Sequence, residues 1–154
     1  MSPAFEVIHR LKRKTLCTAE SLTGGGIGAA LTAVPGASEV YVGGVISYTN
    51  EVKKKVLGVP AEILEQYGAV SMQTAGYMAD GVRKLLDADI AVSVTGLAGP
   101  TGDEFGHDVG TVFICYNSEE DTIVKKYHFS GDRAFVRQQT IDAALSLILE
   151  HNPE

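Results

Sequence analysis

Residues 15–26, TLCTAESLTGGG, join an apolar, strand-like run to a glycine-rich turn that opens a helix. Glycines let main-chain N–H groups approach a ligand, and the start of a helix favours an anion. A serine at position 21 would have both features beside it. Two interpretations stay open from the spacing alone: Ser21 acts as a nucleophile, or Ser21 or Thr23 only caps the helix.

Outward from this stretch, strand-like and helical patterns alternate along the chain. The early alternation followed by a hairpin predicts the α/β class, with a mixed β-sheet covered by helices on both faces, in a single domain spanning residues 1–154. Ligands of such sheets usually bind beyond the strand ends. We expect helices at about 3–12 and 24–33, from about residue 50, from about residue 60 with Pro60 in the first turn, after Ser71 as N-cap, and from Asp132. We expect strands at about 14–19, 42–48, 89–95, 110–117 and 121–129.

Composition excludes several classes of partner. The 154 residues are 45% hydrophobic and carry a net charge of −6. Non-specific binding to nucleic acid needs clustered Lys and Arg to neutralise many phosphates, so this acidic composition predicts no nucleic acid partner. No apolar run approaches the ~18 residues of a membrane span, and no signal-peptide pattern opens the chain. Cys17 and Cys115 lie in apolar runs and are expected to be buried and reduced, so we predict a soluble, cytoplasmic protein with no membrane partner.

A second segment, residues 47–55, SYTNEVKKK, joins a strand end to a helix start. Lys53 falls in the first turn of that helix, where the dipole disfavours a cation and a lowered pKa is one outcome. A general base needs such a pKa. The alternative is an exposed helix charge, which is the interpretation we favour for Lys54 and Lys55.

Two later segments also carry binding features. Residues 93–102, SVTGLAGPTG, end a buried strand in a glycine-rich turn whose N–H groups suit a phosphate or an oxyanion. In residues 130–139, SGDRAFVRQQ, Asp132 is a plausible N-cap, and Arg133 and Arg137 lie four apart on one helix face. Such a pair suits a phosphate or a carboxylate, or forms surface ion pairs.

The loop after the second glycine turn carries Asp103, Glu104, His107 and Asp108. Their spacing matches no metal-ligand pattern, so we interpret them as solvated loop charges. We therefore expect neither a metal nor an organic cofactor.

Taken in order, five motifs resemble those of one family. The chain resembles the CinA C-terminal domain family from about residue 5 to 150, and the members of known activity are PncC-type nicotinamide-nucleotide amidases. Five motifs in register are far more specific than any one of them. The motifs are TAESLTGG at 18–25, YTNEVK at 48–53, GAVS at 68–71, GLAGP at 96–100 and GDRAFVRQQ at 131–139.

The resemblance implies a three-layer α/β/α fold and a serine–lysine amidase. Such an enzyme converts nicotinamide mononucleotide (NMN) and water to nicotinic acid mononucleotide and ammonia, in the recycling of NAD. The resemblance assigns the nucleophile to Ser21, the base to Lys53 and a supporting tyrosine to Tyr48. It also implies a free-standing form, without the domain related to molybdopterin-binding proteins that larger members carry. The loop 101–108 departs from the family's usual pattern.

The predicted substrate contacts combine the resemblance with the glycine turns. The resemblance implies Thr95, Arg137 and Gln138, and the turns and the arginine face add Thr23, Gly24, Gly25, Gly96 and Arg133. We expect the oxyanion to be held by N–H groups at Gly24–Gly25 or Gly96. The expected partner is NMN, and we expect a homo-oligomer, with a dimer as one form. The alternative function is a non-catalytic nucleotide-binding module of a CinA-like, competence- or DNA-damage-inducible protein.

Overall fold

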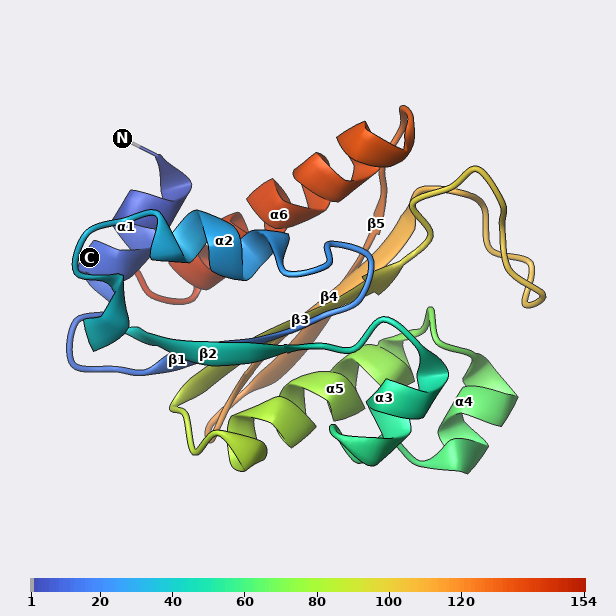
Figure 1. Ribbon diagram of the computed structural model, residues 1–154, viewed down its shortest axis with the longest axis horizontal. Helices are drawn as coiled ribbons and strands as arrows, with labels where there is room; N and C mark the ends of the chain where they lie inside the picture. The colour runs from blue at the N-terminus through green and yellow to red at the C-terminus, as the bar shows by residue number, and fades with distance from the viewer. Residues whose placement is uncertain (1) are drawn as a thin grey trace.

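The structure is a computed structural model that describes residues 2–154 (Figure 1). Within this range it contains six α-helices, five strands and one short 3-10 helix. Their bounds are α1 Pro3–Arg10, β1 Leu16–Glu20, α2 Gly26–Thr32, the 3-10 helix Ala37–Glu39, β2 Tyr41–Ile46, α3 Asn50–Lys55, α4 Ala61–Tyr67, α5 Met72–Leu85, β3 Ile90–Gly96, β4 Thr111–Ser118, β5 Thr122–His128 and α6 Arg133–Glu150.

The five strands form one mixed sheet in the order β2-β1-β3-β4-β5. Strand β1 pairs in parallel with both β2 and β3, whereas β3, β4 and β5 pair antiparallel in sequence. The predicted mixed sheet and the predicted hairpin of β4 and β5 are confirmed. Because the chain leaves β1 for β2 on one side and later returns to β3 on the other, the strand order reverses at β1.

Helices cover both faces of the sheet, which confirms the three-layer prediction. In Figure 1, α1, α2 and α6 lie on one face, and α3, α4 and α5 lie on the other. Each face has its own hydrophobic cluster, and the side chains of the central strands alternate between them. The first cluster includes Val7, Leu16, Ile27, Val92, Val94, Val136 and Ile148, and the second includes Cys17, Ala19, Leu57, Met78, Val82, Ala91 and Cys115.

The two cysteines occupy the second cluster as reduced, buried thiols, as predicted. Burial raises the pKa of each thiol to about 12. A thiol with so high a pKa is a poor nucleophile, so Cys17 and Cys115 are packing residues. In the part of the chain that the structure describes, no helix has the length and apolar character of a membrane span.

Short polar side chains begin several helices, as the sequence predicts. Ser71 Oγ accepts a hydrogen bond from Thr74 N at 3.0 Å, and Asp132 Oδ1 accepts one from Phe135 N at 2.9 Å. Pro60 differs slightly from expectation, because it is the N-cap of α4 and the first helical residue is Ala61.

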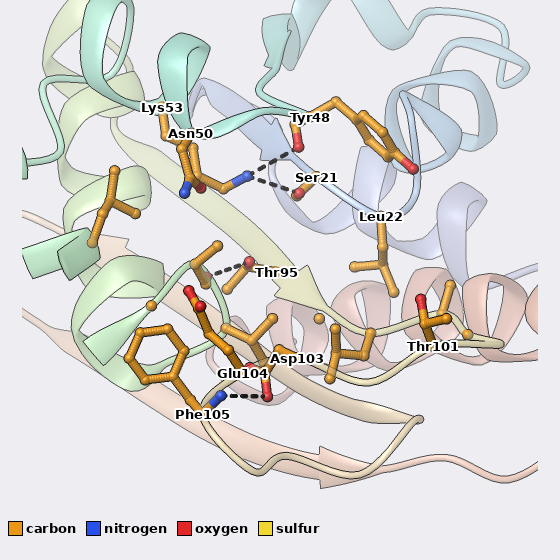
Figure 2. A pocket seen from close by; sticks show the side chains of 18 of the residues that line it. Ser21, Leu22, Tyr48, Asn50, Lys53, Thr95, Thr101, Asp103, Glu104 and Phe105 are labelled. Carbon is orange, nitrogen blue, oxygen red and sulfur yellow. Dashed lines mark hydrogen bonds between the residues drawn. The ribbon is translucent and has the colours of Figure 1, made fainter. Parts of the chain in front are cut away.

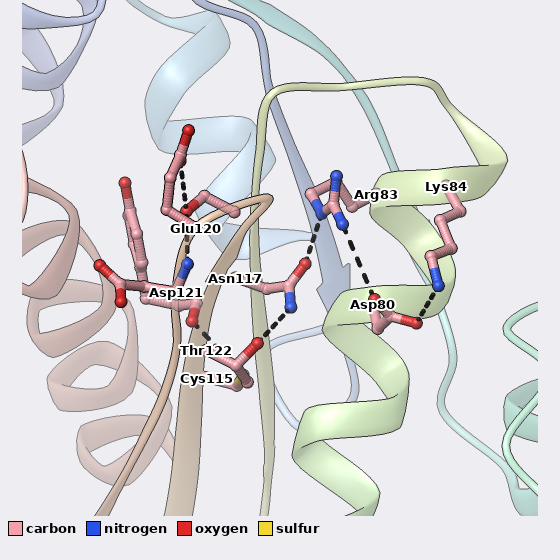
Figure 3. Close-up of polar contacts among 10 residues, drawn as sticks. Asp80, Arg83, Lys84, Cys115, Asn117, Glu120, Asp121 and Thr122 are labelled. Atoms are coloured by element: carbon pink, nitrogen blue, oxygen red, sulfur yellow. Dashed lines mark hydrogen bonds and ion pairs between the residues drawn. The ribbon is translucent and has the colours of Figure 1, made fainter.

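A polar network ties α5 to the β4–β5 hairpin (Figure 3). Arg83 Nε donates to Asn117 Oδ1 at 2.5 Å, and Asn117 Nδ2 donates to Thr122 Oγ1 at 2.8 Å. Asn117 pairs with Ala91, near the start of β3, so the network lies at the end of the sheet opposite the carboxyl ends of the parallel strands. The network fixes the position of α5 against the sheet.

Candidate active site

The carboxyl ends of the three parallel strands meet at one edge of the sheet, and a cavity of about 440 Å³ opens there (Figure 2). This is the topological switch point, where ligands of open α/β sheets bind. Ser21 follows β1, Lys53 follows β2 on α3, and Thr95 and Gly96 end β3. The cavity is lined by Ser21, Leu22, Tyr48, Asn50, Lys53, Leu64, Gly68, Ala69, Val70, Thr95, Gly96, Leu97, Ala98, Gly99, Thr101, Asp103, Glu104, Phe105 and Arg133.

Ser21 and Lys53 form a direct pair in this cavity. Lys53 Nζ lies 3.0 Å from Ser21 Oγ, and it donates to the carbonyl oxygen of Ser47 at 2.7 Å and to that of Tyr48 at 3.4 Å. Ser21 is 7% exposed and Lys53 is 1% exposed. The two carbonyls orient the amine toward the serine, so a neutral Lys53 amine is placed to accept the hydroxyl proton.

Burial lowers the pKa of Lys53 from its ordinary value to about 8. The charged amine is hard to keep in a site from which water is excluded. Among residues 2–154, no carboxylate lies within ion-pair distance of Nζ to oppose this effect. The sequence left three causes open, which were desolvation, the helix N-terminus and hydrogen bonding near Tyr48, and the burial of Lys53 favours desolvation. Lys54 and Lys55 are the predicted surface charges, since both pair with Glu51 at 3.4 Å.

Glu20, which the sequence analysis did not single out, anchors the turn that carries Ser21. Its carboxylate accepts hydrogen bonds from the main-chain N–H groups of Ile27 at 2.8 Å and Gly28 at 3.0 Å. The hydroxyl of Thr23 donates to it at 2.7 Å, and that of Thr18 donates at 3.3 Å. Glu20 is 2% exposed. A buried carboxylate needs such donors. An acidic residue at the end of an apolar strand was therefore the sequence feature that could have identified Glu20 as a structural residue.

This carboxylate changes two expectations for the first turn of α2. Neither Ser21 nor Thr23 caps the helix: the N-cap is Gly25, without a side-chain bond, and Glu20 accepts from the first N–H groups. The start of α2 therefore already holds an anion, supplied by the protein itself. Gly24 N also donates to the carbonyl oxygen of Ser21 at 3.1 Å, so Gly24 has no free N–H for an oxyanion.

Arg137 supports the serine turn from outside the cavity. Its Nε donates to the carbonyl oxygen of Leu22 at 2.9 Å, and its Nη2 donates to that of Thr23 at 3.0 Å. Gly24 follows with φ +59° and Gly25 with φ +100°, a left-handed backbone that favours glycine. Arg137 thus ties α6 to the turn that follows Ser21.

Arg133 and Tyr48 meet at the cavity. Arg133 Nη2 donates to Tyr48 Oη at 2.9 Å, and its Nη1 donates to the carbonyl oxygen of Gly99 at 2.7 Å. The side chain of Tyr48 is 57% exposed, and it contacts Lys53 only through its main-chain carbonyl. Thr95 Oγ1 donates to the carbonyl oxygen of Ala69 at 2.7 Å, which joins β3 to the α4–α5 connection.

Of the residues predicted from the sequence, the cavity brings together Ser21, Lys53, Tyr48, Thr95, Gly96 and Arg133. The remaining predicted residues, which are Thr23, Gly24, Gly25, Arg137 and Gln138, do not line it. Gln138 instead donates to Asp142 on the surface of α6 at 3.1 Å. No contact with substrate is tested by this structure, so their roles in binding stay predictions.

The loop 101–108 contributes more than the sequence suggested. Thr101, Asp103, Glu104 and Phe105 line the cavity. Glu104 and Asp108 are exposed, as expected of solvated loop charges, whereas Asp103 is half-buried and bonds to His107. Within residues 2–154 no group of three His, Cys, Asp or Glu side chains is arranged to hold a metal ion.

The fold and the site define a class: a three-layer α/β protein with a buried serine–lysine pair at the topological switch point. The chain belongs to the CinA C-terminal domain family, whose model matches residues 3–151. A CinA-like protein of Thermotoga neapolitana is 45% identical over 152 residues, which cover 97% of this chain and 37% of that protein.

Solved structures of the same superfamily have the same fold. A competence-damaged protein (CinA) superfamily protein from Escherichia coli matches with a TM-score of 0.95 at 34% identity, covering 97% of this chain and 88% of that one. One from Klebsiella pneumoniae matches with a TM-score of 0.93 at 35% identity, covering 96% and 94%. The chain spans about a third of the length of the curated relatives it matches. Their names, which are CinA-like protein and putative competence-damage inducible protein, specify no reaction.

Proposed function

We propose that this protein is a nicotinamide-nucleotide amidase that hydrolyses NMN to nicotinic acid mononucleotide and ammonia. The observation that carries the proposal is the 3.0 Å contact between Lys53 Nζ and Ser21 Oγ, with burial lowering the pKa of Lys53 to about 8. Serine and lysine in hydrogen-bond contact are a nucleophile and its base. The resemblance to amidases of the family supplies the substrate.

In the first half of the reaction, neutral Lys53 takes the hydroxyl proton of Ser21, and Oγ attacks the carboxamide carbon. The tetrahedral intermediate collapses as Lys53 returns the proton to the departing ammonia, which leaves a nicotinoyl ester on Ser21. In the second half, Lys53 takes a proton from water, the resulting hydroxide attacks the ester, and the proton returns to Ser21. The products are nicotinic acid mononucleotide and ammonia.

The main-chain N–H groups of Leu22 and Thr23 are our candidates for holding the oxyanion. They directly follow the nucleophile, and neither donates to an acceptor in residues 2–154. Hydrogen-bond donors aimed at the developing charge usually provide the largest single contribution to such reactions. Two glycines predicted from the sequence as oxyanion donors stay candidates beside them. Gly25 has an N–H group that donates to no acceptor in residues 2–154, and Gly96 lies at the end of β3.

Arg133 is the better placed of the two predicted phosphate holders. Both guanidinium groups make internal hydrogen bonds, but Arg133 lines the cavity and Arg137 does not. A guanidinium group binds phosphate through paired hydrogen bonds. The cavity, about 440 Å³, has the size of a small-molecule site.

The remaining expectations belong to the same proposal. We place the enzyme in the cytoplasm, in NAD recycling, and the two reduced cysteines support a reducing compartment. Assembly as a homo-oligomer stays a prediction. The chemistry above needs no metal, so prolonged treatment with EDTA is expected to leave the rate unchanged.

The direct test is a coupled assay of ammonia release from NMN by the wild-type protein and by Ser21→Ala. Loss of the nucleophile should lower kcat by several orders of magnitude. The matched control is Ser38→Ala, which removes an exposed serine hydroxyl from a residue that does not line the cavity. This variant should keep wild-type activity. If Ser21→Ala retained more than about a tenth of kcat, Ser21 would not be the nucleophile. Tight binding of NMN by the wild type without ammonia release would favour a non-catalytic nucleotide-binding module.

A further inference from the structure

The loop between β3 and β4 forms one side of the cavity, and its carboxylates have different environments. Figure 2 shows Asp103, Glu104 and Phe105 on the other side of the cavity from Lys53. The loop therefore presents acidic and aromatic groups to whatever occupies the space in front of Ser21.

Asp103 is committed to the internal structure of the loop. Its Oδ1 accepts from the main-chain N–H groups of Phe105 at 3.2 Å and His107 at 2.9 Å, and its Oδ2 lies 2.8 Å from His107 Nδ1. Partial burial opposes ionisation, but the hydrogen bonds from His107 prevail and hold the pKa of Asp103 below its usual value. Asp103 thus fixes the turn that presents the next two residues.

Glu104 is the carboxylate that remains without a partner. Among the described residues 2–154 its side chain makes no hydrogen bond and no ion pair, although it lines the cavity. A carboxylate of this kind is ready to interact with an incoming cation. The free-energy cost of a negative charge on Glu104 is small, because water reaches this exposed side chain.

Phe105 is held beside Glu104 by a close contact with Gly68. A Cβ atom on Gly68 would lie 2.6 Å from Phe105 Cδ2, so only glycine leaves room for the ring. The ring is nevertheless 39% exposed, and it lines the cavity. An aromatic face in this position attracts a cationic ring through its quadrupole and by stacking.

We propose that Glu104 and Phe105 are specificity residues that select a positively charged pyridine ring over a neutral one. This inference rests on the proposed function, because the ring of NMN carries a positive charge at its glycosylated nitrogen. The phosphate end would be held by Arg133, while Glu104 opposes the ring charge and Phe105 contacts the ring face. The loop between β3 and β4 would thus determine which form of the ring is accepted.

The test compares the binding of two nucleotides that differ in ring charge. NMN has the cationic ring, and reduced NMN has the same carboxamide, ribose and phosphate on a neutral dihydropyridine ring. Dissociation constants are measured by calorimetry on the Ser21→Ala protein, so that no turnover interferes. Glu104→Gln in this background should raise the Kd of NMN about tenfold, because one charge contact is lost. The Kd of reduced NMN should change by less than about twofold.

Asp108→Asn is the matched control, because it removes the same charge from the same loop at a residue outside the cavity lining. It should leave both dissociation constants unchanged. Phe105→Leu should also weaken NMN more than reduced NMN. Equal effects of Glu104→Gln on the two nucleotides, or no effect, would overturn the inference, as would the absence of saturable binding by Ser21→Ala.

The outcome is separable from that of the proposed function, which depends on ammonia release by the wild-type protein. Charge-selective binding without any turnover would support the role of Glu104 and refute the amidase. Turnover of NMN with no change in affinity on Glu104→Gln would support the amidase and refute the role of Glu104.

Discussion

The side chain of Lys53, on α3, places its Nζ atom 3.0 Å from the Oγ atom of Ser21, at the end of β1. The two residues lie 32 positions apart in the chain. The pair exists because β1 and β2 are parallel neighbours, so the loops that follow them begin at the same edge of the sheet. The reaction we propose depends on this contact and on the proton affinity of the amine.

Lys53→Arg should be nearly as damaging as Lys53→Ala. Arginine keeps a positive charge but does not deprotonate in this pH range, so it cannot act as a base. We expect kcat to fall by several orders of magnitude with little change in KM. In the wild type, kcat/KM should rise with pH and level off above about 8, where Lys53 becomes neutral. An active Lys53→Arg enzyme with a normal pH profile would show that another group activates Ser21.

Lys53 should also leave a signature in the pH dependence of stability. Its pKa is about 8 in the folded protein and 10.5 for the free side chain, so the unfolded chain binds more protons between these values. The free energy of unfolding should therefore rise between pH 8 and 10.5, relative to Lys53→Met, by about 3 kcal/mol. Urea denaturation of both proteins across this range measures the difference. Parallel curves would mean that the lysine is not desolvated.

Arg133 and Arg137 should respond differently to removal of the substrate phosphate. Arg133→Ala is expected to raise KM for NMN about tenfold or more and to leave KM for nicotinamide riboside, which lacks the phosphate, nearly unchanged. Arg137→Ala should lower kcat for both substrates, because the carbonyls of Leu22 and Thr23 lose their donor. If Arg137→Ala affected only the phosphorylated substrate, Arg137 and not Arg133 would hold the phosphate.

Glu20→Gln should destabilise the protein and slow the reaction together. The amide is nearly isosteric, but it keeps only one acceptor oxygen for the N–H groups of Ile27 and Gly28 and the hydroxyl of Thr23. We expect the free energy of unfolding to fall by about 2 kcal/mol. We expect kcat to fall at least tenfold as the serine turn loosens, since small misplacements of a nucleophile are costly. Glu62→Gln on the exposed surface of α4 is the control and should change neither quantity.

The sequence was sufficient to predict the mixed sheet, the layers, the hairpin and the caps at Ser71 and Asp132, because periodicity and capping are local signals. The pairing of Ser21 with Lys53 came from the resemblance to the CinA C-terminal domain family. The sequence could not decide between burial and the other possible causes of a lowered pKa of Lys53, because burial depends on how α3 packs over the cavity.

The roles of Glu20 and of the loop 101–108 were also beyond the sequence. Glu20 adjoins the nucleophile in the chain, yet its partners on α2 are apparent only when the turn is folded. Asp103 and Glu104 are adjacent acidic residues with the same appearance in the sequence. Only the structure distinguishes the one bonded to His107 from the one that faces the cavity without a partner.

The position of β1 between β2 and β3 has a consequence for how the protein acquires activity during folding. The main-chain N–H group of Thr15, just before β1, donates to Asp89 Oδ2, 74 residues later, at 2.8 Å. Ser21 N donates to the carbonyl oxygen of Val94 at 3.1 Å. Closing so long a segment costs chain entropy before the new contacts compensate, which slows folding. Ser21 precedes β3 in the chain, but its turn is complete only after β3 has docked beside β1. Recovery of ammonia release should therefore follow the slowest refolding phase, which makes the reaction a reporter of the fully assembled sheet.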